Sequence, residues 1–199
     1  MKFVWQALGL CRTPAPAFAL IAIGILTGCA DPASKLPDYG KVPAFTMTDS
    51  TGRPFSSKAL SGKVWIVDFI YTHCPAECPL MTAKMKKVEE TIKGQDDVGI
   101  LSISVDPARD SPPVLNDFAH HFGGPTNQWV FLTGTAPTIH LLAYETFHVG
   151  DVLGKIEHST KFMLVDKRER LRGYYSSFDQ DGISALLKDL AALRHQRSS

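Results

Sequence analysis

Two cysteines, Cys74 and Cys78, stand close together in the stretch "YTHCPAECPL", residues 71–80. Three residues separate them, whereas the redox pairs of thioredoxins usually have two intervening residues. A deprotonated cysteine attacks disulfides, and it also binds soft metal ions such as copper(I) or zinc. The residue types therefore fit a thiol–disulfide couple, a metal site or a structural bridge, and at this point all three remain open.

The flanking sequence predicts that the pair lies where a strand passes into a helix. The apolar run "VWIVDFIY" at 64–71 is typical of a strand buried on both faces. After the pair, Met81, Met85, Val88 and Ile92 recur at helical spacing. The N-terminus of a helix presents unpaired N–H groups and partial positive charge, which stabilise a thiolate. If both cysteines lie on one helical face, their backbones are about 6 Å apart, within reach of a disulfide.

The rest of the chain alternates between strand-like and helix-like segments. Strands are expected at 98–105 and 129–132 and in a hairpin formed by "KFMLV", 161–165, and "LRGYY", 171–175; helices are expected after Ser111, after Thr135 and through Ile183 to Leu193. This order predicts an α/β sheet covered by helices on both faces. Ligand sites in such sheets lie beyond the C-terminal ends of strands, where the cysteine pair is expected.

Composition and the N-terminus narrow the class of protein. The 199 residues are 44% hydrophobic and 21% charged, with a net charge of +1, which suits a globular protein and gives no basic footprint for nucleic acid. The apolar run "AFALIAIGILTG" ends at Cys29, and "LTGC" resembles a bacterial lipoprotein signal. We therefore expect a signal peptide at 1–28, lipid on Cys29, a linker at 29–40 and one domain at 41–199. An uncleaved N-terminal anchor is the alternative, and either arrangement tethers the domain to a membrane outside the cytoplasm.

A histidine stands where thioredoxin-like oxidoreductases generally carry a cis-proline. The last proline of the chain is Pro137, and the residues before the strand at 161–165 are His158, Ser159 and Thr160. In that fold the loop before this strand lies against the cysteine pair. His158 is therefore expected to face Cys74 and Cys78.

Three motifs in order resemble the Sco/SenC family of copper chaperones. Cys74, Pro75, Cys78 and Pro79 match its CPxxCP core, "SVDPARDSP" resembles its second motif, and "EHSTKFMLVD" resembles its third, with His158 at the histidine position. Glu157 departs from the aspartate common in the family but keeps the charge. The resemblance covers roughly residues 40–195.

The resemblance implies a fold, a cargo and a function. The fold is thioredoxin-like, with a central mixed sheet flanked by helices. One copper ion, as copper(I) or copper(II), is bound by Cys74, Cys78 and His158. The family assists assembly of the CuA centre of cytochrome c oxidase, by delivering copper or by reducing that centre's cysteines. The implied partners are the oxidase subunit that carries CuA and other periplasmic copper carriers or thiol reductants, in the bacterial cell envelope.

A thiol–disulfide reductase is the alternative function, so enzymatic activity stays open. A chaperone requires His158 as much as the two cysteines, whereas in a reductase His158 is secondary. Four further residues have possible roles. His73 borders Cys74 and either tunes its thiol, touches the metal or merely flanks the site; Asp106 and Asp110 either order the neighbouring loop or only form its turn. Asp68, inside an apolar strand, is either an acid that assists thiol proton transfer or a hydrogen-bonded residue at the edge of the sheet.

Overall fold

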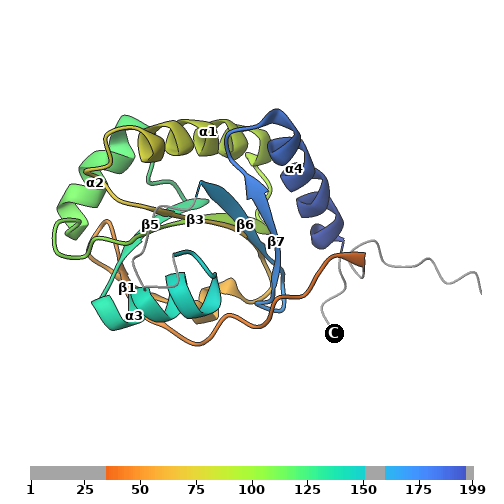
Figure 1. Cartoon of the computed structure of the whole chain (residues 1–199), viewed down its shortest axis with the longest axis horizontal. Helices are drawn as coiled ribbons and strands as arrows, with labels where there is room; N and C mark the ends of the chain where they lie inside the picture. Colours follow the sequence, from red (N-terminus) through yellow and green to blue (C-terminus); the bar gives the residue numbers. More distant parts are fainter. Residues whose placement is uncertain (1–34, 151–159, 196–199) are drawn as a thin grey trace, which may run out of the picture.

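The computed structural model describes residues 35–150 and 160–195, which form a seven-stranded sheet with helices on both faces (Figure 1). The strands are β1 (Thr46–Asp49), β2 (Pro54–Ser56), β3 (Val64–Ile70), β4 (Val98–Ser104), β5 (Trp129–Thr133), β6 (Lys161–Val165) and β7 (Leu171–Ser176). The helices are η2 (Ser57–Leu60), α1 (Glu77–Ile92), α2 (Pro112–His121), α3 (Ala136–His140), the π-helical turn η3 (Leu141–Thr146) and α4 (Gln180–Arg194). The predicted thioredoxin-like fold with a mixed sheet is confirmed.

Strand β3 lies near the middle of the sheet, whose order is β2-β1-β5-β4-β3-β6-β7. It pairs in parallel with β4 along its whole length, from Val64 opposite Val98 to Ile70 opposite Ser104. On its other side it pairs antiparallel with β6, and β6 forms the predicted hairpin with β7. The hairpin of β1 and β2 was not predicted. Its strands have four and three residues and carry no apolar run, so their pairing leaves little trace in the sequence.

Alternate residues of β3 pack into two separate cores. Val64, Ile66 and Ile70 face the layer of α1, α2 and α4, while Trp65, Val67 and Phe69 face the layer that contains α3. Because strand side chains alternate between faces, a strand buried on both sides reads as a continuous apolar run. Met81 and Met85 are fully buried in the first core, as their helical spacing predicted.

Local sequence signals mark the ends of the helices. Gly94 follows α1 with a φ of +80°, the left-handed conformation that glycine adopts at the end of a helix. Ser111 is the N-cap of α2, with Pro112 at its first position. Thr135 caps α3, where its hydroxyl accepts a hydrogen bond from the Thr138 N–H at 3.4 Å.

The N-terminal segment that the structure describes is bound to the sheet. The N–H of Tyr39 donates to the Leu171 carbonyl at 2.9 Å, and the Arg172 guanidinium donates to the carbonyls of Leu36 and Pro37. Residues 36–40 of the predicted linker therefore lie against β7. Cys29 and the predicted signal peptide lie outside the described residues, and the proposed domain division stays a prediction. Within residues 35–150 and 160–195, no helix is long and apolar enough to span a membrane.

Candidate metal and thiol site

The cysteine pair lies at the junction of β3 and α1, at the C-terminal end of a central strand, as predicted. Both residues are reduced and buried, with 5% of Cys74 and none of Cys78 exposed. The Cys78 N–H donates to the Cys74 sulfur at 3.3 Å. The two cysteines do not lie on one helical face, the arrangement that their spacing allowed. Helix α1 begins at Glu77, because Ala76 has a non-helical φ of −143°, so Cys74 lies in the loop before it.

The two thiols have opposite acid–base properties. Burial acts to raise the pKa of Cys74, but hydrogen bonds from the N–H groups of Cys78 and Ala76 outweigh it and lower that pKa overall. Burial raises the pKa of Cys78 to about 12, and the nearby Cys74 and Asp68 add to the increase. Cys74 is therefore the residue that forms a thiolate. Stabilisation by N–H groups at the start of a helix is confirmed, and it acts on the cysteine that precedes the helix.

Asp110 ties the cysteine loop to the loop that follows β4. Its buried carboxylate accepts hydrogen bonds from the Thr72 N–H at 3.1 Å, the Thr72 hydroxyl at 2.6 Å and the Ser104 hydroxyl at 2.5 Å. The Ser104 oxygen in turn accepts from the Asp106 N–H at 3.1 Å. The prediction that Asp110 orders the loop beside the site is confirmed. Asp106 contributes through its backbone, and its carboxylate pairs with Arg109 at 3.6 Å.

Asp68 is buried between the sheet and the layer of helices that contains Cys78. It lies on the same face of β3 as Ile66 and Ile70, and its Oδ1 accepts from the Ser102 hydroxyl at 2.6 Å. Ser102 accepts in turn from the Trp129 indole N–H at 2.9 Å, whereas Asp68 Oδ2 has no hydrogen-bond partner among the described residues. Burial raises the pKa of Asp68 to about 7. The expectation of an edge position is wrong, because β3 lies between β4 and β6.

The expected third ligand, His158, lies outside the described residues. The strand that follows it in sequence, β6, runs antiparallel to β3 with Met163 opposite Val67. The start of β6 therefore lies at the cysteine end of β3. Within residues 35–150 and 160–195, no three histidine, cysteine or acidic side chains are grouped to hold a metal ion. In the described part of the site, Cys74 and Cys78 thus supply the soft donor atoms.

Sequence reasoning missed the hydroxyl groups that join these loops. Thr72, Ser102 and Ser104 each donate to a buried carboxylate. The two serines alternate with apolar residues in "VGILSISV", which places them on one face of a buried strand. Two polar side chains on one face of such a strand require partners, so this spacing was the available signal.

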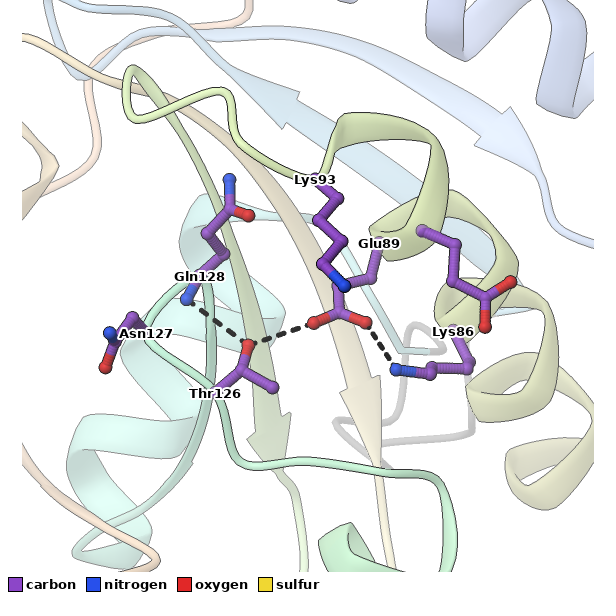
Figure 2. A pocket seen from close by; sticks show the side chains of 7 residues that line it. Lys86, Glu89, Lys93, Thr126, Asn127 and Gln128 are labelled. Carbon is purple, nitrogen blue, oxygen red and sulfur yellow. Dashed lines mark hydrogen bonds and ion pairs between the residues drawn. The ribbon is translucent and has the colours of Figure 1, made fainter.

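A second polar cluster surrounds a pocket of about 390 Å³ near the other end of α1 (Figure 2). Glu89 accepts hydrogen bonds from the Lys86 ammonium at 2.6 Å and from the Thr126 hydroxyl at 3.0 Å. The side-chain N–H of Gln128 donates to the Gln95 carbonyl at 2.8 Å. Lys93, Glu90 and Asn127 complete the lining. None of these residues was predicted from the sequence.

Comparison with known proteins identifies the family. The family model described as SCO1/SenC matches residues 34–193 of the chain. The chain belongs to the SCO1/SenC family. This assignment agrees with the three motifs and with the position of the cysteine pair.

Three solved structures of family members resemble this one. A SCO1/SenC lipoprotein from Bacillus anthracis is 32% identical, with a TM-score of 0.71, covering 80% of this chain and 97% of its own. BsSco, described as a member of the Sco family of cytochrome c oxidase assembly proteins with a disulfide switch, is 30% identical, with a TM-score of 0.70, covering 82% and 98%. ScoI from Bradyrhizobium japonicum, solved with copper bound, is 25% identical, with a TM-score of 0.63, covering 77% and 99%.

Proposed function

We propose that this SCO1/SenC protein is a membrane-tethered copper chaperone that assists assembly of the CuA centre of cytochrome c oxidase. Cys74, Cys78 and His158 hold one copper ion. The observation that carries the proposal is the reduced, buried cysteine pair at the end of a central strand, in a family with a copper-bound member. The oxidase subunit that carries CuA is the proposed recipient, and other copper carriers or thiol reductants are the proposed donors.

The chemistry of the pair supports this cargo. Thiolate sulfur is a soft donor that favours copper(I), and imidazole nitrogen suits both copper oxidation states. The Cys78 N–H donates to the Cys74 sulfur, which holds the first ligand in place before a metal arrives. Two thiolates and one histidine leave an open position, through which copper is passed on by ligand exchange.

The difference between the two thiols supports thiol–disulfide reduction as a second function. The Cys74 thiolate attacks a disulfide of a partner protein, forming a mixed disulfide and releasing one partner thiolate. Cys78 then attacks the Cys74 sulfur, so the bond to the partner breaks and its second thiolate leaves. Two electrons pass from the cysteine pair to the partner disulfide. BsSco, the relative with a disulfide switch, gives this alternative a specific basis.

The proposed location is the outer side of a bacterial membrane, with a lipid on Cys29 as the anchor. The support is the "LTGC" motif and the lipoprotein from Bacillus anthracis. Both cofactor loading and thiol exchange then take place in the cell envelope. Labelling of the cells with a radioactive fatty acid tests this part, because Cys29→Ser abolishes incorporation if Cys29 carries the lipid.

An anaerobic copper titration of the reduced, full-length protein tests the main function. We expect one copper per chain, and we expect His158→Ala to lose most of the affinity while keeping its fold. A protein that takes up no stoichiometric copper contradicts the chaperone. If the His158→Ala variant binds copper as the parent does and both reduce a disulfide substrate, the reductase function is correct instead.

His121→Ala is the matched control for this titration. The His121 ring is exposed on α2, and its Nδ1 lies 2.7 Å from the carbonyl of Asp117 in the same helix. We expect this variant to bind copper as the parent does. An equal loss in both variants indicates that removal of any histidine weakens binding, and the assignment of His158 then fails.

A further inference from the structure

The Thr72 hydroxyl lies between a buried carboxylate and an exposed imidazole. Its oxygen is 2.6 Å from Asp110 Oδ1 and 3.0 Å from His73 Nδ1. His73 Nδ1 itself is 3.9 Å from Asp110 Oδ1, too far for a direct hydrogen bond. Asp110 therefore contacts His73 through Thr72.

The count of hydrogens assigns each donor in this relay. A carboxylate only accepts hydrogen bonds, and a hydroxyl has one hydrogen to donate. Because Thr72 donates that hydrogen to Asp110, its oxygen accepts from His73, and Nδ1 is the protonated nitrogen of the neutral ring. The other nitrogen, Nε2, then carries a free lone pair. The relay thus fixes the tautomer of His73.

The orientation of the ring exposes that lone pair. Asp110 is fully buried, whereas 56% of the His73 side chain is accessible to solvent. The two ring nitrogens lie on different edges of the imidazole, so anchoring Nδ1 toward the buried relay turns Nε2 away from it. Histidines that bind metals almost always donate their other N–H to a carboxylate, carbonyl or water. His73 has the equivalent arrangement, with a hydroxyl interposed.

We propose that His73 is an additional copper-binding residue, whose Nε2 takes up copper at the surface and passes it to Cys74 and Cys78. This inference rests on the proposed copper function. Its physical basis is access. The two cysteines are 5% and 0% exposed, so the ligand atoms of a donor protein or chelator have little direct access to their sulfurs. His73 is bonded directly to Cys74, and adjacent Cα atoms are about 3.8 Å apart. An exposed imidazole at this position supplies the first ligand in a transfer by ligand exchange.

Two other described side chains near Cys74, those of Glu77 and Tyr71, are poorer first ligands for copper(I). Glu77 offers a hard carboxylate, and it already accepts a hydrogen bond from the Cys74 thiol at 3.6 Å. Tyr71 keeps its phenolic proton, since its interaction with Cys74 raises the pKa of Tyr71 to about 12. Among the described residues near Cys74, His73 is thus the one with a nitrogen lone pair suited to copper.

Stopped-flow transfer of copper(I) to and from the full-length protein tests the proposal. The probe is bathocuproine disulfonate, a copper(I) chelator whose complex is coloured. We expect His73→Ala still to take up one copper per chain, but to load and release it at least about tenfold more slowly. We expect Thr72→Val, which removes the relay hydroxyl, to slow transfer as well. Thr72→Ser keeps a hydroxyl at this position, and we expect it to transfer copper at the parent rate. Unchanged rates in His73→Ala overturn the proposal.

His121→Ala is again the matched control, because the His121 ring is exposed and its Nδ1 also lies beside an acceptor, at 2.7 Å from the Asp117 carbonyl. Its Nε2 is therefore available in the same way, but it lies on α2 rather than beside Cys74. We expect His121→Ala to transfer copper at the parent rate. An equal slowing in both variants overturns a specific role for His73.

Nitrogen-15 NMR of the imidazole rings separates this proposal from the proposed function. In the metal-free protein we expect His73 to be protonated at Nδ1, and in Thr72→Val we expect this preference to be lost; protonation at Nε2 overturns the proposal. In a Cys74→Ser/Cys78→Ser variant, added copper(II) is expected to broaden the His73 signals before those of His121. If the parent binds no stoichiometric copper while His73 is broadened first, the chaperone function fails together with the transfer to the cysteines, and only copper binding by His73 stands. If His121 is broadened first or equally, the His73 site fails.

Discussion

The two ends of helix α1 carry polar networks of different kinds. At the N-terminal end, Asp110 joins the cysteine loop to the loop after β4 through Thr72 and Ser104. Near the C-terminal end, Glu89 joins α1 to the loop before β5 through Thr126 (Figure 2). In each case a carboxylate accepts a hydrogen bond from a threonine hydroxyl of another segment. The local chemistry is thus similar.

The difference lies in what each network leaves open. Near the C-terminal end, Glu89 is bonded to Lys86 and Thr126, so its acceptors are occupied by the protein itself. The N-terminal network holds the loop that carries reduced Cys74 and Cys78, and by our assignment it ends in the free Nε2 of His73. A pocket of about 390 Å³ is present at the end without these donors. Open ligand atoms held by a satisfied network, rather than volume, distinguish the end of the helix that we propose to be functional.

We call the N-terminal end of α1, with Cys74, Cys78 and His73, the open end, and the end with Glu89 and Thr126 the closed end. The largest expected effect compares the two thiols at the open end. At neutral pH we expect iodoacetamide to alkylate Cys74 in a Cys78→Ser variant much faster than Cys78 in a Cys74→Ser variant. The reason is that the pKa of Cys74 is lowered whereas that of Cys78 is raised to about 12. The expected ratio of rates is between about 30-fold and 1,000-fold, depending on how far the lower nucleophilicity of Cys74 offsets its larger thiolate fraction. Mass spectrometry of timed samples measures both rates, and equal rates contradict the assignment of Cys74 as the thiolate.

Asp110→Asn tests whether the network supports the open end. The amide of asparagine places N–H groups against the donors of Thr72 and Ser104, so buried donors lose their acceptor. We expect a loss of about 2–4 kcal/mol in the free energy of unfolding and a weaker affinity for copper. Urea unfolding and copper titration measure the two effects. Asp106→Asn is the control, because its carboxylate pairs with the exposed Arg109, and we expect a change below about 0.5 kcal/mol.

Much of the open end was predictable because its main residues are marked by local patterns. The apolar run of β3 and the helical spacing of Met81 and Met85 predicted the strand–helix junction that holds the cysteines. Such patterns record burial, which each segment shows independently of its neighbours. The motif "SVDPARDSP" likewise indicated that Asp110 borders the site.

The relay itself was not predictable, because it depends on contacts between distant segments. Thr72 and Asp110 are 38 positions apart, and their hydrogen bonds form only when two loops close against each other. The central position of Asp68 depends likewise on β6 pairing beside β3, which the order of segments did not fix. Helix α1 begins three residues after Cys74 because of the backbone of Ala76, a boundary too fine for spacing to predict.

Asp68→Asn tests the buried carboxyl group below the open end. The pKa of Asp68 is raised from 3.8 to about 7 in the folded chain, so its contribution to stability is present below pH 3.8 and is lost as the pH rises through 7. The variant lacks this loss. Relative to the parent, we expect Asp68→Asn to gain roughly 2–4 kcal/mol between about pH 4 and pH 8, measured by urea unfolding.

Asp49→Asn is the control of opposite sign. Burial acts to raise the pKa of Asp49, but hydrogen bonds from Thr51 and Arg53 lower it overall. Its contribution to stability is therefore present above the unfolded pKa and is lost as the pH falls through the folded pKa. We expect this variant to be less stable than the parent at neutral pH, with the difference shrinking in acid. If both variants change with pH in the same direction, the raised pKa of Asp68 is wrong.

The smallest expected effect comes from the same substitution made at both ends of α1. Thr126→Val removes the hydroxyl that donates to Glu89 at 3.0 Å, and Thr72→Val removes the one that donates to Asp110 at 2.6 Å. At the closed end we expect a loss of about 0.5–1.5 kcal/mol in the free energy of unfolding and no change in the rate of copper transfer. At the open end we expect the same loss of a hydroxyl to slow copper transfer, because the His73 ring loses its hydrogen-bond partner. If Thr126→Val slows transfer as much as Thr72→Val, copper transfer follows general stability, and the distinction between the two networks is lost.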